Sequence, residues 1–242
     1  MGERADGWPA AAAWQAWAAQ VGIGAVLGLL LVGGVFVIEL AAGWLIVRGV
    51  AAGALIALAV GLGRAIAVAV VEEAVFRGAL LGYLQRPLGS AGAAAVSSVA
   101  FALAHAWNTN ATPLAIANLV VAGVLFALAC LVARGSAVSF AAEEAKARGI
   151  GQLAYALGRG LPLPVGIHAA WNFFEGSAFG LPVSGSPRDS LLAVSVSGPD
   201  LLTGGAFGPE GGLLGLGATI VVGLMLWAVR GRVPRAAPLT AL

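Results

Sequence analysis

Apolar runs of helical length, separated by short polar or turn-forming segments, dominate the chain. A membrane-spanning helix needs about 20 mostly apolar residues. The runs cover residues 21–46, 50–62, 65–84, 91–106, 114–133, 162–179 and 213–229. Several begin or end at helix breakers, for example Arg86-Pro87-Leu88-Gly89 and Thr112-Pro113. The pattern predicts an all-α fold, a polytopic transmembrane helix bundle with six to eight membrane segments.

Two stretches interrupt this pattern. Residues 135–160 carry several acidic and basic side chains, and we expect a short amphipathic excursion there. Residues 181–212 are rich in Gly, Ser and Pro and carry scattered charges, which is typical of a long surface loop.

The composition agrees with a membrane protein. Hydrophobic residues make up 60% of the chain and charged residues 10%, whereas soluble domains carry about 25% charged residues. Mean hydropathy is +0.95. The net charge of +2 is too small to imply a nucleic-acid partner. The first twenty residues lack the basic start and compact apolar core of a cleavable signal peptide, so we expect the helices themselves to anchor the protein.

Three charged residues lie inside one of the apolar runs. Each charge near the centre of a spanning helix costs about 2.5–3.5 kcal/mol on insertion scales, so Glu72, Glu73 and Arg77 indicate a functional site. On a helix, Glu73 and Arg77 share a face and can pair. Glu72 points about 100° away and is free to act as an acid or a base. A packing network between helices would explain these charges, but it would not explain the histidines.

The chain contains two histidines, and both lie in apolar runs. Phe101 precedes His105 by four residues and can pack beneath it, while Asn108 is placed to orient the imidazole or to cap the helix. His168 and Asn172 are also four residues apart and share a helical face.

These groups together suit hydrolysis of an amide by an activated water. Glu72 with His105 would deprotonate the water, and His168 with Asn172 would form an oxyanion site. Glu73, Arg77, Phe101 and Asn108 are expected to have supporting roles.

The ordered motifs Glu-Glu-x-x-x-Arg, Phe-x-x-x-His and His-x-x-x-Asn resemble those of the CAAX protease and bacteriocin-processing (CPBP, or Abi) family of intramembrane endopeptidases. The resemblance covers roughly residues 63–229 and includes the glycine-rich stretch 203–212. It implies a glutamic-type endopeptidase in which Glu72 and His105 activate water and His168 and Asn172 bind the oxyanion. We expect no metal cofactor, because Asn172 is a poor zinc ligand but a good oxyanion donor. The charged stretch 135–160 departs from the tight turn expected in the family.

The resemblance also implies a division of the chain. Residues 1–62 would form N-terminal membrane helices, residues 63–230 the catalytic membrane domain, and residues 231–242 a cytoplasmic tail. The basic residues near the C-terminus favour the cytoplasmic side. We therefore expect a multi-pass protein of the plasma or inner membrane of a prokaryote. Its partners would be the lipid bilayer and a peptide or membrane-anchored protein substrate.

Alternatives remain open. Glu72, His105 and His168 would also suit a zinc ion with a bound water, which gives a zinc-dependent version of the same protease. A non-catalytic immunity or scaffold protein of the same fold would have no need of the complete motif set. A transporter with a Glu–His proton relay is disfavoured because the two halves show no internal repeat.

Overall fold

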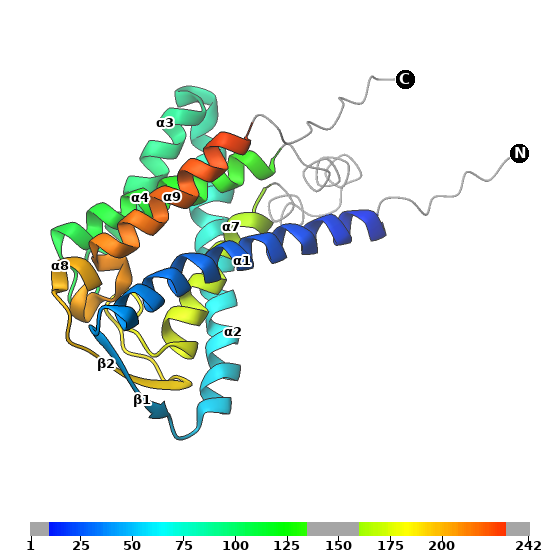
Figure 1. The fold of residues 1–242 in the computed structure, drawn as a ribbon. Helices are drawn as coiled ribbons and strands as arrows, with labels where there is room; N and C mark the ends of the chain where they lie inside the picture. The colour runs from blue at the N-terminus through cyan, green and yellow to red at the C-terminus, as the bar shows by residue number, and fades with distance from the viewer. Residues whose placement is uncertain (1–9, 135–159, 231–242) are drawn as a thin grey trace, which may run out of the picture.

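The structure is a computed structural model that describes residues 10–134 and 160–230. Most of these residues are helical (Figure 1). The elements are, in order, α1 (Ala10–Ala41), β1 (Leu45–Val50), α2 (Ala54–Glu73), η1 (Ala74–Leu80), α3 (Leu81–Ala104), α4 (Pro113–Ala133), α7 (Pro162–Asn172), η2 (Phe173–Ala178), β2 (Leu192–Val196), α8 (Asp200–Thr203), η3 (Gly205–Phe207), η4 (Pro209–Gly211) and α9 (Leu213–Val229). The expected excursion, apart from Gly160, and the expected tail lie outside the described residues.

Three helical stretches are long and apolar enough to cross a membrane: Gln15–Ala41, Ala54–Ala104 and Pro113–Ala133. The apolar helix α9 is shorter. The structure therefore confirms a mostly helical protein with three candidate membrane-spanning stretches among the described residues, but not the predicted six to eight segments. One reason is that the predicted runs 50–62 and 65–84 join in one helical stretch from Ala54 onward, because only Gly63 and Arg64, and no proline, separate them.

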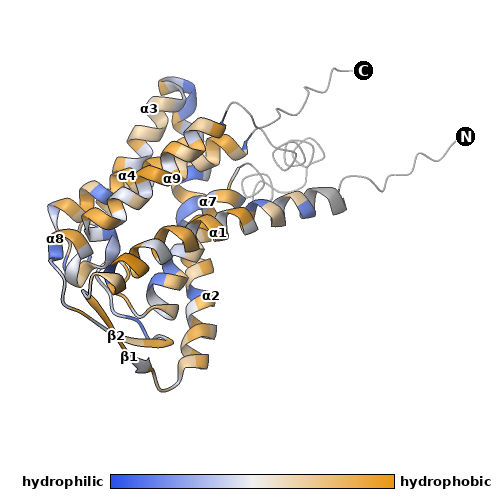
Figure 2. Ribbon diagram, in the orientation of Figure 1, coloured by the Kyte–Doolittle hydropathy of each residue, from blue (hydrophilic) through white to orange (hydrophobic). Residues whose placement is uncertain are grey.

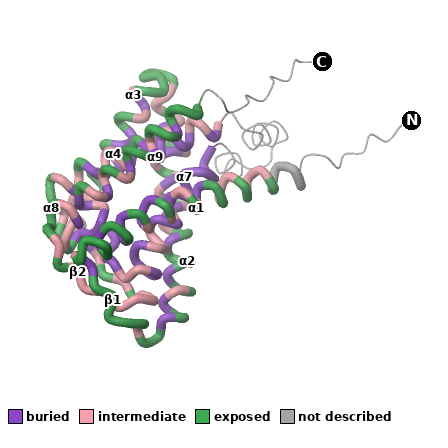
Figure 3. Tube along the Cα trace, viewed as in Figure 1, coloured by how far each residue is buried: buried purple, intermediate pink, exposed green. Residues whose placement is uncertain are grey.

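Much of the outer surface of the helices is apolar, as Figure 2 shows in orange. Large exposed side chains such as Leu55, Ile56 and Leu224 project from α2 and α9. Lipid tails solvate such side chains without cost, so this surface fits a membrane environment. Figure 3 shows the complementary pattern, with the buried residues concentrated where α7 meets its neighbours.

A two-stranded antiparallel sheet, β1 with β2, corrects the all-α prediction. The first predicted run ends as a helix at Ala41, and Gly43 then adopts a positive φ of 72°. Such a glycine stops a helix readily. The β-branched residues that follow favour a strand, and Leu45 pairs with Val196 of the predicted surface loop.

Helix α7 crosses α1 closely through small residues. A methyl group at Gly28 would lie 2.4 Å from the Ile167 carbonyl oxygen, and one at Gly166 would lie 2.3 Å from the Val21 carbonyl oxygen. Small residues allow helix backbones to approach in a membrane, where no hydrophobic drive brings helices together. This crossing fixes the position of the His168 helix.

Two of the three charged or polar motifs continue directly into π-helical segments, η1 after Glu72-Glu73 and η2 after Asn172. Such segments are frequent at functional sites. In η1, Ser97 Oγ donates a hydrogen bond to the Phe76 carbonyl at 2.8 Å, and Arg134 donates one to the Arg77 carbonyl at 3.1 Å. Side chains thus satisfy backbone groups that the altered helix leaves open.

Candidate active site

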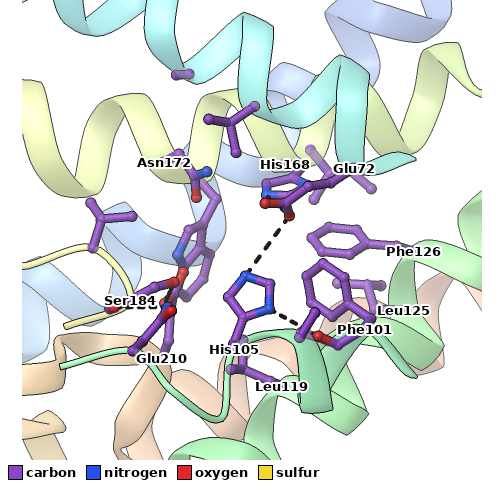
Figure 4. A pocket seen from close by; sticks show the side chains of 18 of the residues that line it. Glu72, Phe101, His105, Leu119, Leu125, Phe126, His168, Asn172, Ser184 and Glu210 are labelled. Carbon is purple, nitrogen blue, oxygen red and sulfur yellow. Dashed lines mark hydrogen bonds and ion pairs between the residues drawn. The ribbon is translucent and has the colours of Figure 1, made fainter. Parts of the chain in front are cut away.

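A cavity of about 480 Å³ lies between the helices and the loop 181–212 (Figure 4). Its walls come mainly from α2, α3, α4, α7 and α9 and from this loop, with single residues of α1 and η2 and two of η1. The sequence-predicted residues that line it are Glu72, Phe101, His105, Asn108, His168 and Asn172. The structure thus brings motifs from three separate helices together around one space.

Glu73 and Arg77 lie behind the cavity wall and are fully buried. Arg77 Nη1 donates to Glu73 Oε1 at 2.9 Å, as their spacing predicts. The same carboxylate oxygen lies 3.0 Å from His168 Nδ1. Because an ionised carboxylate can only accept, Nδ1 donates this bond. Glu73 therefore joins the first motif to the third, a contact that the sequence did not reveal.

An aromatic enclosure surrounds the Arg77 guanidinium. Its carbon lies 4.5 Å from the Phe101 ring centre and 5.0 Å from that of Phe126, and Arg77 Nη2 donates to the Gly123 carbonyl at 3.2 Å. Phe126 also stacks on the His168 ring, with centres 4.9 Å apart. Cation–π contacts and these hydrogen bonds compensate a charge removed from water.

Glu72 faces the cavity, with a side chain 25% exposed. Its Oε2 lies 3.7 Å from His168 Nε2 and 3.9 Å from His105 Nε2. It has no hydrogen-bond partner among the described residues. These separations are too long for direct hydrogen bonds. They are shorter than the roughly 4.4 Å between two acceptors of one water, so a shared water lies beside these atoms and not between them. The two imidazoles thus converge on one carboxylate oxygen.

His105 is held by the end of its own helix. Its Nδ1 lies 2.9 Å from the Phe101 carbonyl oxygen, which can only accept, so Nδ1 carries the proton. In the neutral ring Nε2 then offers a lone pair toward Glu72. The ring packs on Phe101 with centres 4.7 Å apart, as predicted from their spacing. The His105 backbone, at φ −98° and ψ 0°, ends α3.

Asn172 projects from the last turn of α7 into the cavity, one turn beyond His168 (Figure 4). Asn108 has a different role from orienting an imidazole through its side chain. Its Nδ2 donates to the Ser184 carbonyl at 3.1 Å, and its backbone N–H donates to the His105 carbonyl. Asn108 therefore ties the loop 181–212 to the His105 turn.

This loop supplies cavity residues that sequence reasoning missed. Ser184 and Glu210 line the cavity, and Ser184 Oγ donates a hydrogen bond to Glu210 Oε2. Asn118 Nδ2 holds the Glu210 and Gly212 carbonyls at 3.0 and 2.9 Å. The only signal in the sequence was a single acidic residue within a glycine-rich stretch.

Burial shifts the pKa values of two charged residues in the loop. Burial raises the pKa of Glu210, and the Ser184 hydrogen bond opposes this shift in part. Burial also lowers the pKa of Arg188, which lines the cavity, and repulsion from Arg64 adds to that effect. The cavity therefore contains two acids in different settings, Glu72 on a helix and Glu210 on the loop.

The donor set Glu72, His105 and His168 suits zinc chemically. Both Nδ1 atoms are engaged and both Nε2 atoms face Glu72, which is how metal-ligating histidines are oriented. Tetrahedral zinc ligands lie roughly 3.4 Å apart, given bonds of about 2.1 Å. The separations from Glu72 are somewhat wider, and the described residues contain no group of three His, Cys, Asp or Glu arranged to hold a metal.

Residues 53–142 match the family model described as type II CAAX prenyl endopeptidase Rce1-like. This range holds the Glu72 and His105 motifs and ends before His168. No curated protein and no solved structure matches the chain. Over residues 53–142 the match confirms the family resemblance that the motifs predict.

Proposed function

We propose that this protein is an intramembrane endopeptidase that hydrolyses a peptide bond near the membrane surface by means of an activated water. The observation that carries the proposal is the convergence of two imidazole Nε2 atoms on Glu72 Oε2, at 3.7 and 3.9 Å, inside a cavity. The family match supports protease activity of this kind.

Glu72 and His105 activate the water. A water that lies beside Glu72 Oε2 and His105 Nε2, on the cavity side, donates to both acceptors, which turns a lone pair toward the substrate carbonyl carbon. The Phe101 carbonyl keeps the His105 proton on Nδ1, so Nε2 stays available as an acceptor. As the water attacks, Glu72 takes its proton.

His168 and Asn172 bind the oxyanion. Among the charged groups next to His168, the carboxylates of Glu72 and Glu73 favour an imidazolium, and the Arg77 guanidinium offsets one of them. A protonated His168 brings this buried cluster to neutrality, and Glu73 Oε1 at 3.0 Å stabilises it. His168 Nε2–H and the Asn172 amide then stabilise the negative oxygen of the tetrahedral intermediate.

The zinc-dependent version is the second candidate, favoured by the free Nε2 atoms of both histidines. Glu72, His105 and His168 would hold the ion, which would act as a Lewis acid and lower the pKa of a bound water. In that version Asn172 still donates to the oxyanion, and Glu73 still orients the His168 ring.

The experiment is peptide cleavage by the purified protein in liposomes, followed with a library of quenched fluorescent peptides. Wild type is compared with Glu72→Gln and His168→Ala, each with and without a strong zinc chelator. We expect cleavage by wild type to survive the chelator and to fall about 10²–10⁴-fold in both variants.

Glu39→Gln is the matched control, because Glu39 is a buried acid of α1 that does not line the cavity. It should cleave as wild type does. Loss of wild-type cleavage on chelation would assign the three residues to zinc. Cleavage that persists in Glu72→Gln would contradict the proposed chemistry in both versions.

A further inference from the structure

The loop acid Glu210 has no assigned role in the chemistry above, although it lines the same cavity as Glu72. Figure 4 shows the two acids flanking His105. Among the described residues of the cavity wall they are the only acids. Their settings differ. Glu72 Oε2 faces two imidazoles, whereas the Glu210 carboxyl accepts the Ser184 hydroxyl at Oε2.

The loop holds Glu210 in place through several contacts. Ser184 has a positive φ of 46°, a strained conformation for a residue other than glycine. Asn108 Nδ2 donates a hydrogen bond to the Ser184 carbonyl, and the Gly185 backbone N–H donates to the Phe207 carbonyl at 2.8 Å. Strain of this kind persists only where its surroundings enforce it and is concentrated at functional sites.

Hydrolysis of an amide needs an acid as well as a base. The leaving nitrogen departs as an amine only if it gains a proton when the C–N bond breaks. Glu72 has by then taken the proton of the water, and His168 and Asn172 are engaged with the oxyanion. A second acid in a different environment is the usual solution to this requirement.

We infer that Glu210 is the proton donor to the leaving amine, an inference that rests on the proposed peptidase function. When the tetrahedral intermediate collapses, the oxyanion reforms the carbonyl and the C–N electron pair moves to nitrogen. That nitrogen takes the proton of the Glu210 carboxyl, and the amine leaves. The proton that Glu72 took from the water then returns through solvent to Glu210, so the products are one carboxylic acid and one amine.

The charges around Glu210 are consistent with a protonated carboxyl. His105 and His168 face it across the cavity, Glu175 lies behind it, and Arg188 is the nearest loop cation. Helices α4 and α9, which pack against η4, contain no charged residue, and α8, which also packs against η4, contributes the exposed acid Asp200. Burial outweighs these groups and raises the pKa of Glu210, as a general acid near neutral pH requires.

The test compares two substrates with the same acyl portion, a peptide amide and a p-nitrophenyl ester. The leaving group of the ester is p-nitrophenolate, a weak base that departs without taking up a proton. We expect Glu210→Gln to lower kcat for the amide about 10²–10³-fold and to leave ester cleavage within about twofold of wild type. The matched control is Asp200→Asn, an exposed acid of the same loop outside the cavity, which should cleave both substrates normally.

The pH profile separates a proton donor from a residue that only shapes the cavity. Amide cleavage by wild type should decline on the alkaline side as Glu210 ionises. Ser184→Ala removes a hydrogen bond that lowers the pKa of Glu210, so this decline should move to higher pH. The inference is overturned if Glu210→Gln cleaves the amide at the wild-type rate, or if it loses ester and amide cleavage equally.

A wild-type protein that cleaves neither substrate would overturn the proposed function itself, and the role of Glu210 would fall with it. Normal wild-type cleavage of both substrates, lost in Glu72→Gln but unchanged in Glu210→Gln, would overturn only the inference. In that case Glu72 returns its own proton to the amine.

Discussion

The helical wall and the loop wall of the cavity hold their acids in different ways. On the helical side, Glu73 is fully buried between Arg77 and His168, with hydrogen bonds of 2.9 and 3.0 Å. On the loop side, Glu210 is held by one hydroxyl and by backbone contacts through glycine-rich turns. The helical wall therefore holds its buried acid by pairing it with charged and hydrogen-bonding side chains, and the loop wall holds its acid mainly through the conformation of the backbone.

Because of this difference, the residues that stabilise the fold are not the ones that face the substrate cavity. Glu73 and Arg77 stabilise the junction of α2, α4 and α7 and do not line the cavity. Glu72 and Glu210 line it; Glu72 Oε2 has no hydrogen-bond partner among the described residues, and the Glu210 carboxyl accepts the Ser184 hydroxyl. A substitution behind the wall should lower the free energy of unfolding, whereas one at the cavity surface should lower the rate of cleavage.

The largest expected effect is on the helical side. Arg77→Ala leaves Glu73 buried without its cation, and breaking a buried ion pair in this way costs about 3–5 kcal/mol. Thermal unfolding in detergent measures this loss. Arg64→Ala removes an exposed arginine of the same helical stretch and should leave the unfolding midpoint nearly unchanged. Equal midpoints for the two variants would contradict a structural role for Arg77.

The next effect concerns the crossing of α1 and α7. Gly28→Ala puts a methyl group 2.4 Å from the Ile167 carbonyl oxygen, and overpacking against a backbone should cost about 2–3 kcal/mol. Gly22→Ala on the same helix meets no atom within 4 Å and is the control. Because His168 follows Ile167, we also expect Gly28→Ala to lower the rate of peptide cleavage. An unchanged rate would show that the crossing of α1 and α7 does not position His168.

On the loop side, Gly208→Ala should cost about 1–2 kcal/mol, because φ of 100° is reserved almost entirely for glycine. The added methyl group would lie 2.1 Å from the Pro182 carbonyl oxygen, so the turn must move and shift Glu210. The rate of peptide cleavage should fall further than the loss of folded protein alone explains. Ala206→Ser, at an exposed position of the same loop, should leave both unchanged.

The smallest expected effect is the pH dependence of stability that Glu210 contributes. Its pKa is raised on folding, so the folded state binds the proton more tightly than the unfolded state does. The stabilisation is complete below the unfolded pKa of about 4.3 and is lost as pH rises through the folded pKa. Unfolding midpoints measured from about pH 5 to about pH 9 should decline less in Glu210→Gln than in wild type. Parallel declines would show that Glu210 ionises normally.

Local signals in the sequence predicted several elements well. The predicted runs 114–133 and 213–229 match α4 and α9 closely. Thr112 caps α4 by accepting from the Ala115 backbone N–H at 3.1 Å, and Pro113 is its first residue. The turn signal at residues 86–89 coincides with a break in α3 at Gly89, which has φ 67° and ψ 175°.

Contacts between distant segments could not be predicted in this way. The partner of β1 lies about 150 residues away in a stretch that composition marked as surface loop, so the sheet had no local signal. The bond from His168 to Glu73 likewise joins residues 95 positions apart. Glu72 was evident because a charge in an apolar run is costly. Glu210 was not evident, because a charge in a polar loop carries no such penalty.

The account's central claim is that Glu72 and His105 act together on one water, and a double-mutant cycle in cleavage rate tests it most directly. Groups that act as a unit are strongly non-additive in kcat. We predict that Glu72→Gln, His105→Ala and the double variant all cleave the best library peptide at about the same low rate. Losses that multiply in the double variant, with all three proteins folded, would contradict the claim.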